Sequence, residues 1–122
     1  MARHNETGNW GENIAAEYLS SKGYAIAERN WRSGHYEIDI VAYNDARIIF
    51  VEVKTRSNQD EDPVEAVDSR KAMRLIRAAL VYIGSHDINH EPQFDIIAIN
   101  GTPDAFQIEH IPDALQPPLH TY

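Results

Sequence analysis

Two acids and a lysine lie inside two largely apolar stretches of the chain, and their types suit a divalent metal site. Residues 36–43 contain Asp39, and residues 47–55 contain Glu52 and Lys54. A charge buried in a strand is costly unless it is paired or bound to a metal. Two carboxylates completed by water are the hard oxygen ligands that Mg²⁺ or Mn²⁺ prefers. The pattern therefore predicts such a metal between Asp39 and Glu52.

The two stretches predict a β-hairpin. Both are rich in Ile, Val, Phe and Tyr, and residues 44–46 between them, Asn-Asp-Ala, favour a turn. Because side chains alternate between the faces of a strand, we expect Ile38 and Ile40 on one face of the first strand. The matching apolar set of the second strand is Ile49, Val51 and Val53. Burying both sets together requires an antiparallel register in which paired residue numbers have an odd sum, and a tight turn at residues 45–46 would put Ile40 opposite Val51.

The same register places Asp39 across from Glu52 on the other face, with Glu37 and Lys54 beside them. Two like charges at opposed positions destabilise a hairpin, and a divalent cation between them reverses that effect. Glu37 has two possible roles, as an accessory metal ligand or as an exposed partner of Lys54 or Arg56.

A predicted helix over residues 8–22, which Gly23 ends, carries a third acid. Glu12 shares a helical face with the small and apolar residues Ala15 and Leu19 rather than with the solvated side. A helix packed on the sheet could aim this carboxylate at the hairpin acids.

The order and spacing of these residues resemble the PD-(D/E)XK nuclease superfamily, which has the restriction-endonuclease-like fold. The matching pieces are Glu12, the Gly-x-x-Glu-Ile-Asp run of residues 34–39, and the Val-Glu-Val-Lys-Thr-Arg run of residues 51–56. More narrowly, residues 8–99 resemble a family of small bacterial proteins regarded as relatives of the archaeal Holliday-junction resolvases. That match adds Gly-Glu-x-x-Ala-x-x-Tyr-Leu at residues 11–19, Asn-Trp-Arg at 30–32, Lys71, and Phe-Asp-Ile-Ile at 94–97.

The resemblance implies an endonuclease that hydrolyses DNA phosphodiesters at branched or otherwise unusual structures. It implies that Asp39 and Glu52 hold the metal and that Glu12 completes its ligands. Lys54 would orient or activate the attacking water and meet the phosphate charge. Such hydrolysis needs a nucleophilic hydroxide and compensation of charge on the phosphoryl oxygens, both of which bound metal supplies. Cutting paired strands needs two active sites, so the resemblance also implies a twofold homodimer.

Several basic residues are candidates for contact with DNA. Three arginines flank the predicted site strands: Arg29, Arg32 and Arg56. A second predicted helix, residues 65–83, carries a basic stripe with an adjacent lysine: Arg70, Lys71, Arg74 and Arg77. We expect its buried face to contain Ile76, Ala79, Leu80 and Ile83. The helix stripe could equally track a phosphate backbone or form a solvated face. The three flanking arginines are better placed for phosphate, and their alternative role is pairing with nearby acids.

Composition indicates one small domain over residues 1–122, with an irregular tail from about residue 112. The chain is 43% hydrophobic and 25% charged, and it contains no cysteine. Without a leader or a long apolar run, we expect a soluble cytoplasmic protein that does not enter a membrane. Strands are also predicted at residues 24–31, 94–100 and 106–110. The predicted fold is therefore α/β, a restriction-endonuclease-like core with a mixed sheet of about five strands and two main flanking helices.

The formal net charge of −8 opposes a simple DNA-binding function, because most nucleic-acid binders present a positive surface. Two further functions therefore stay open. One is a nuclease-fold interaction module in DNA repair, recombination or uptake, whose specificity arrives with a recruiting protein. The other is a small acidic binding module with ordinary surface ion pairs, which would not be stabilised by divalent ions.

Overall fold

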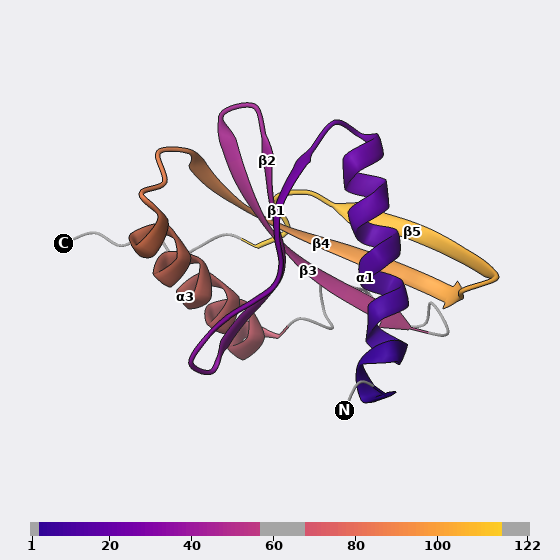
Figure 1. Cartoon of the computed structure of the whole chain (residues 1–122). Helices are drawn as coiled ribbons and strands as arrows, with labels where there is room; N and C mark the ends of the chain where they lie inside the picture. Colours follow the sequence, from indigo (N-terminus) through magenta and orange to yellow (C-terminus); the bar gives the residue numbers. More distant parts are fainter. Residues whose placement is uncertain (1–2, 57–67, 116–122) are drawn as a thin grey trace.

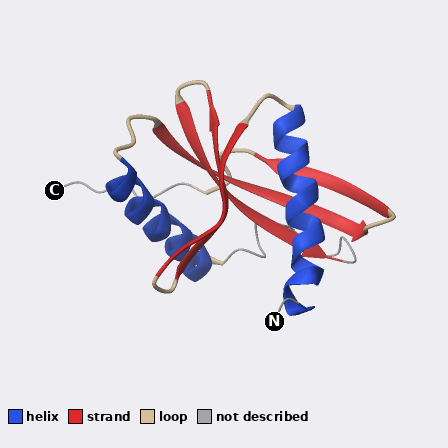
Figure 2. Cartoon of the chain, viewed as in Figure 1, coloured by secondary structure: helices blue, strands red, loops and turns tan. Residues whose placement is uncertain are grey.

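The computed structural model describes residues 3–56 and 68–115, with side chains described from residue 10 onward. Figure 1 shows the path of the chain and Figure 2 its helices and strands. In chain order the elements are α1 (Arg3–Ser21), β1 (Ala25–Ser33), β2 (Tyr36–Asn44), β3 (Arg47–Arg56), α3 (Ser69–His86), β4 (Glu91–Thr102) and β5 (Ala105–Ile111).

The five strands form one mixed sheet in the order β1-β2-β3-β4-β5. Neighbouring strands are antiparallel except β3 and β4, which are parallel. A parallel pair cannot be joined by a tight turn, and α3 lies in the connection that carries the chain from β3 to β4. Within the described residues, the predicted α/β fold with a five-stranded mixed sheet and two helices is confirmed.

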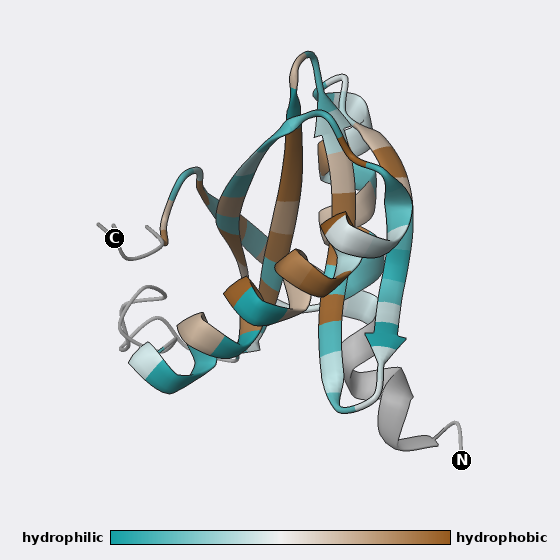
Figure 3. Ribbon diagram, turned by 90° about the vertical axis from the view of Figure 1, so that its left-hand side faces the viewer, coloured by the Kyte–Doolittle hydropathy of each residue, from teal (hydrophilic) through white to brown (hydrophobic). Residues whose placement is uncertain are grey.

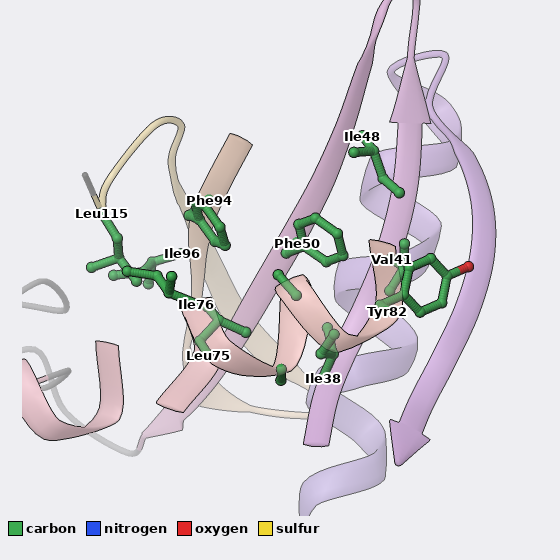
Figure 4. Packing of buried hydrophobic residues seen from close by; sticks show 12 residues of the cluster. Ile38, Val41, Ile48, Phe50, Leu75, Ile76, Tyr82, Phe94, Ile96 and Leu115 are labelled. Carbon is green, nitrogen blue, oxygen red and sulfur yellow. The ribbon is translucent and has the colours of Figure 1, made fainter. Parts of the chain in front are cut away.

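The two helices cover opposite faces of this sheet. Phe50 belongs to the buried cluster under α3, whereas its neighbour Val51 belongs to the cluster under α1. Because side chains alternate along a strand, the two clusters lie on opposite faces. Figure 3 shows hydrophobic residues along the strands in the middle of the sheet, and Figure 4 shows the packing under α3. There the Phe50 ring lies 5.9 Å from the ring of Tyr82 and 5.7 Å from that of Phe94.

The β2–β3 hairpin has the predicted register, with Ile40 opposite Val51. The prediction that Ile38 and Ile40 share a face is wrong, because Ile38 packs under α3 and Ile40 under α1. On β1, Asn30 lies beside the position between them and has a left-handed backbone with φ of 54°. On the other side, the ladder with β3 ends at Ile40. We attribute the change of face to this irregular point, where simple alternation does not hold.

Helix α3 begins later than predicted, and its buried face includes the predicted Ile76 and Ala79 but not Leu80. Asp68 caps its start, with Oδ1 accepting a hydrogen bond from the backbone N of Lys71 at 2.9 Å. The residues buried on α3 are Leu75, Ile76, Ala78, Ala79 and Tyr82. Leu80 was predicted to be buried and is 63% exposed, so that prediction is wrong. Leu80 lies about 100° around the helix from Ala79, beyond the edge of the buried stripe.

Residues 112–115, which follow β5, form no helix or strand and pack against the sheet. The backbone N of Ala114 donates to the carbonyl O of Phe94 at 2.7 Å, and Leu115 is buried in the cluster under α3. The remainder of the predicted tail and residues 57–67 lie outside the described residues. None of the helices in the described segments combines the length and apolar character needed to cross a membrane.

Candidate metal and phosphate site

The candidate site lies where the sheet divides between β2 and β3. These strands pair from their turn only as far as Ile40 and Val51. Beyond that point β2 stays paired with β1, and β3 stays paired with β4. Figure 1 shows the two strand ends running apart. The division begins at Asp39 and Glu52, the residues that come next on each strand.

Asp39 uses its side chain to replace the missing strand partner. Its Oδ2 accepts a hydrogen bond from the backbone N of Val53 at 2.9 Å. Burial, followed by the nearby charge of Glu52, raises the pKa of Asp39 to about 8, although the Val53 N–H acts in the opposite direction. The charges of Glu12 and Glu37 raise this pKa further. Without a bound cation, Asp39 therefore holds a proton near neutral pH.

Glu52 lies beside Asp39 and between two lysines. Burial raises the pKa of Glu52, whereas the positive charges of Lys54 and then Lys71 lower it. Lys54 comes from the same strand face two positions further along β3, and Lys71 comes from the first turn of α3. Both ammonium groups are thus close enough to act on the Glu52 carboxylate.

A cleft of about 220 Å³ lies over these two acids. It is lined by His35, Glu37, Asp39, Glu52, Lys71, Arg74 and Leu75. The acids come from β2 and β3. The basic side chains come from the β1–β2 turn and α3, so the cleft has an acidic floor and a basic side. We call Lys71 and Arg74 together the cationic wall.

Glu12 reaches toward the site from the opposite face of the sheet and does not line the cleft. Its Oε1 lies 3.8 Å from Nη2 of Arg29, and the side chain is 13% exposed. Burial raises the pKa of Glu12, against a hydrogen bond from the Asn30 side chain and the charge of Arg29. Oε1 is buried and has no hydrogen-bond partner among the described residues. Glu12 therefore acts on Asp39 through its charge, which raises the pKa of Asp39, rather than by lining the cleft.

The three arginines expected to flank the site strands are held by carboxylates. The pairs, at 3.7 or 3.8 Å, are Arg29 with Glu12, Arg32 with Glu37, and Arg56 with Glu109. Of these carboxylates only Glu37, the partner of Arg32, lines the cleft. Arg70 is exposed on α3 and does not line the cleft, in contrast to the cationic wall.

The donor set suits a hard divalent cation bound by two carboxylates. Asp39 and Glu52 offer oxygen atoms, and because burial raises the pKa of both carboxyls, a cation bound between them would favour their ionised forms. Within residues 3–56 and 68–115, no three His, Asp or Glu side chains form a ready metal-ligand group. Mg²⁺ and Mn²⁺ are commonly held by one or two carboxylates with water completing the shell. The two acids therefore fit such an ion without requiring Glu12 as a ligand.

Two features were not found from the sequence. His35 lines the cleft, and its position after Gly34 and just before the Glu37 strand was the available signal. The second feature is a buried network on the α1 face. His110 Nε2 lies 2.7 Å from Oδ2 of Asp95, and its Nδ1 lies 2.9 Å from the Tyr18 hydroxyl. Asp95 is fully buried. In the sequence, the only sign of this network is an acid within an apolar strand.

Comparison with known proteins places the candidate site inside a shared region. A family model described as "Uncharacterised protein family UPF0102" matches residues 11–99. A UPF0102 protein of Bacteroides thetaiotaomicron is 49% identical over 120 residues, covering 98% of this chain and 99% of the relative. One of Flavobacterium psychrophilum is 43% identical over 115 residues, covering 93% and 97%. One of Caldanaerobacter subterraneus is 42% identical over 106 residues, covering 85% and 87%.

Proposed function

The chain belongs to the uncharacterised protein family UPF0102, and we propose that it is a divalent-metal-dependent endonuclease that hydrolyses DNA phosphodiesters at branched or otherwise unusual structures. The observation that carries the proposal is the meeting of Asp39 and Glu52 beside Lys54 where the sheet divides. Two buried carboxylates next to a lysine are unfavourable for stability alone, and perturbed groups in a cleft are typical of functional sites.

The chemistry follows from the charges of the site. Mg²⁺ or Mn²⁺ bound by Asp39 and Glu52 would supply a hydroxide nucleophile and compensate charge on the phosphoryl oxygens. Lys54 donates hydrogen bonds to the attacking water or to a phosphate oxygen and stabilises the negative charge that develops there. Glu12 adds negative potential behind Asp39 and favours retention of a cation.

The direct test is metal-dependent cutting by the native protein and by Lys54→Ala. Labelled four-way junctions, flaps, duplex and single strands are incubated with Mg²⁺ or Mn²⁺ and with chelator. We expect the variant to lose at least about a hundredfold in rate, the scale of one electrostatic catalytic group. Its folding should change little. Lys22→Ala, at an exposed position beyond the end of α1, is the matched control.

Cutting that survives chelator, or that is unchanged in Lys54→Ala, would contradict the proposal. No cutting by the native protein would instead favour the second candidate function, an interaction module in DNA repair, recombination or uptake that needs a recruiting partner. The formal net charge of −8 is the observation that supports that alternative. A twofold homodimer in the cytoplasm, presenting two clefts to two strands, is part of the main proposal.

A further inference from the structure

The packing of α3 positions the cationic wall beside the acids of the cleft. The Asp68 cap fixes the start of the helix, which places Lys71 in its first turn and Arg74 one turn later. Residues three apart lie side by side on a helix. Leu75, the next residue, is only 4% exposed and anchors this part of α3 in the core. The two basic side chains are exposed above it.

Arg74 of the cationic wall differs from the other arginines near the site in its ion pairs. Arg29, Arg32 and Arg56 each lie within 4.0 Å of a carboxylate. Within the described residues, Arg74 has no such ion pair and faces the cleft instead. A guanidinium group in this position can bind a phosphate through two parallel hydrogen bonds, and the ammonium group beside it adds a second positive charge.

We propose that Lys71 and Arg74 bind the backbone phosphates of the nucleic-acid strand that lies in the cleft. This inference rests on the proposed function and names the part of the cleft that holds the substrate backbone. Contacts to phosphate fix the position of a strand without reading its sequence. The wall therefore orients the strand over Asp39 and Glu52 irrespective of base sequence, and His35 bounds the strand on the side of the β1–β2 turn.

The charge of the cleft determines when this binding is favourable. Glu37, Asp39 and Glu52 supply the acidic floor, and Glu37 is already paired with Arg32 at 3.7 Å. Any ionised carboxylate on this floor would repel the phosphates of a bound strand. A divalent cation on the floor removes that repulsion, so phosphate and cation bind more tightly together than apart.

The test measures binding separately from cutting. Fluorescence anisotropy follows a labelled single-stranded oligonucleotide titrated with native protein, Lys71→Ala, Arg74→Ala and Arg77→Ala, in Ca²⁺ and in chelator over a range of salt. Arg77 is exposed on the same helix but does not line the cleft, so its variant is the matched control. Circular dichroism and melting temperature verify that each variant is folded.

We expect Lys71→Ala and Arg74→Ala each to weaken binding about tenfold in Ca²⁺ and to lower the salt slope by about 0.7, the value for one lost contact to a single strand. Arg77→Ala should change neither quantity. Arg74→Lys should restore the salt slope but only part of the affinity, because it keeps the charge and loses the planar fork. Tighter native binding in Ca²⁺ than in chelator is also expected.

Wall variants that match Arg77→Ala in both affinity and salt slope would overturn the inference, as would a native protein that binds no oligonucleotide at low salt. The cutting assay separates this result from the proposed function. If the wall variants bind and cut normally while Lys54→Ala does not cut, the nuclease proposal stands and this inference fails. If the wall variants lose binding but the native protein never cuts, this inference stands and the nuclease proposal fails.

Discussion

The carboxylate of Asp39 has a structural and an electrostatic role at the same place. Its hydrogen bond from Val53 satisfies a backbone N–H at the point where β2 and β3 separate. The same placement buries the carboxylate beside Glu52, which raises its pKa to about 8. The Asp39 carboxylate therefore both satisfies the Val53 N–H and is the carboxylate whose ionised form a neighbouring cation would stabilise.

The raised pKa of Asp39 predicts how stability depends on pH in chelator. The carboxyl has a pKa of 3.8 in the unfolded chain and about 8 in the folded protein. The folded state therefore holds a proton that the unfolded state loses, and stability falls as pH rises from about 4 to about 8. Asp39→Asn keeps an acceptor for the Val53 N–H but cannot ionise. As pH rises from about 4 to about 8, we expect the free energy of unfolding of Asp39→Asn to increase by at least about 1 kcal/mol relative to that of the native protein.

Urea unfolding at pH 4, 6 and 8 measures this difference directly. Glu17→Gln, which removes an exposed carboxylate from α1, should follow the native pH profile and is the control. At pH 8, Mg²⁺ should stabilise the native protein by mass action and leave Asp39→Asn nearly unchanged. Parallel curves for the native protein and Asp39→Asn would mean that the pKa of Asp39 is not raised in the folded state.

Residue patterns predicted the acid pair but not every contact that it makes. The hairpin register predicted that Asp39 and Glu52 would meet, and both line one cleft although alternation fails at the neighbouring Ile38. The same pattern could not show that Asp39 binds the Val53 amide, because that contact depends on where the strands separate. Nor could it identify His110 as the partner of Asp95, since sequence does not reveal which histidine of β5 or the loops meets a buried acid.

At the scale of elements, α1 lies close to β3 at Gly11. A Cβ placed on Gly11 would overlap Oγ1 of Thr55 and lie 3.2 Å from its Cβ. The helix can therefore lie this near the strand only because no side chain is present. The contact is adjacent to Glu12 in sequence and to Lys54 on the strand, so it also sets how near α1 brings its acid to the site.

This close approach predicts that Gly11→Ala destabilises the protein although alanine favours helices. Overlap with Thr55 should cost about 1–3 kcal/mol, more than the roughly 1 kcal/mol gained in helix propensity. Gly84→Ala is the matched control, because Gly84 lies in α3 with nothing within 4 Å of an added Cβ. That variant should be neutral or more stable than the native protein. Chemical unfolding curves give both values.

A double-mutant cycle tests the cause of the loss. Thr55→Ala removes Oγ1 and Cγ2, so Gly11→Ala should cost less in that background than in the native protein. Equal costs in the two backgrounds would show that Thr55 is not the obstacle. A stabilised Gly11→Ala single variant would show that α1 can move away from β3 without loss.

The elements were predictable from periodicity, but the faces they turn to each other were predictable only where the structure is regular. The strands and their register followed from apolar alternation and from the turn at residues 44–46. The assignment failed for Ile38, beside a left-handed Asn30, and for Leu80, at the edge of the buried stripe of α3. Both errors come from local geometry that hydrophobic pattern does not encode.

At the scale of the whole molecule, the basic side of the cleft is a local exception on an acidic protein. The formal net charge is −8, and the cationic wall contributes only two positive charges at the candidate site. Long-range potential therefore opposes the approach of DNA, whereas the cleft favours one strand once it has arrived. Such a molecule would depend on a second copy or a recruiting protein for tight binding.

This balance predicts weak binding of DNA by the isolated chain. At about 150 mM salt we expect dissociation constants in the micromolar range or weaker for duplex, because few phosphates are contacted and the remaining surface repels them. A twofold dimer would present two clefts to a four-way junction and bind it more tightly than a single strand of equal length. Anisotropy titrations with the three DNAs, run beside sedimentation velocity of the protein alone, measure both quantities. Nanomolar binding of duplex by a sedimenting monomer would mean that a basic surface outside the cleft carries the affinity.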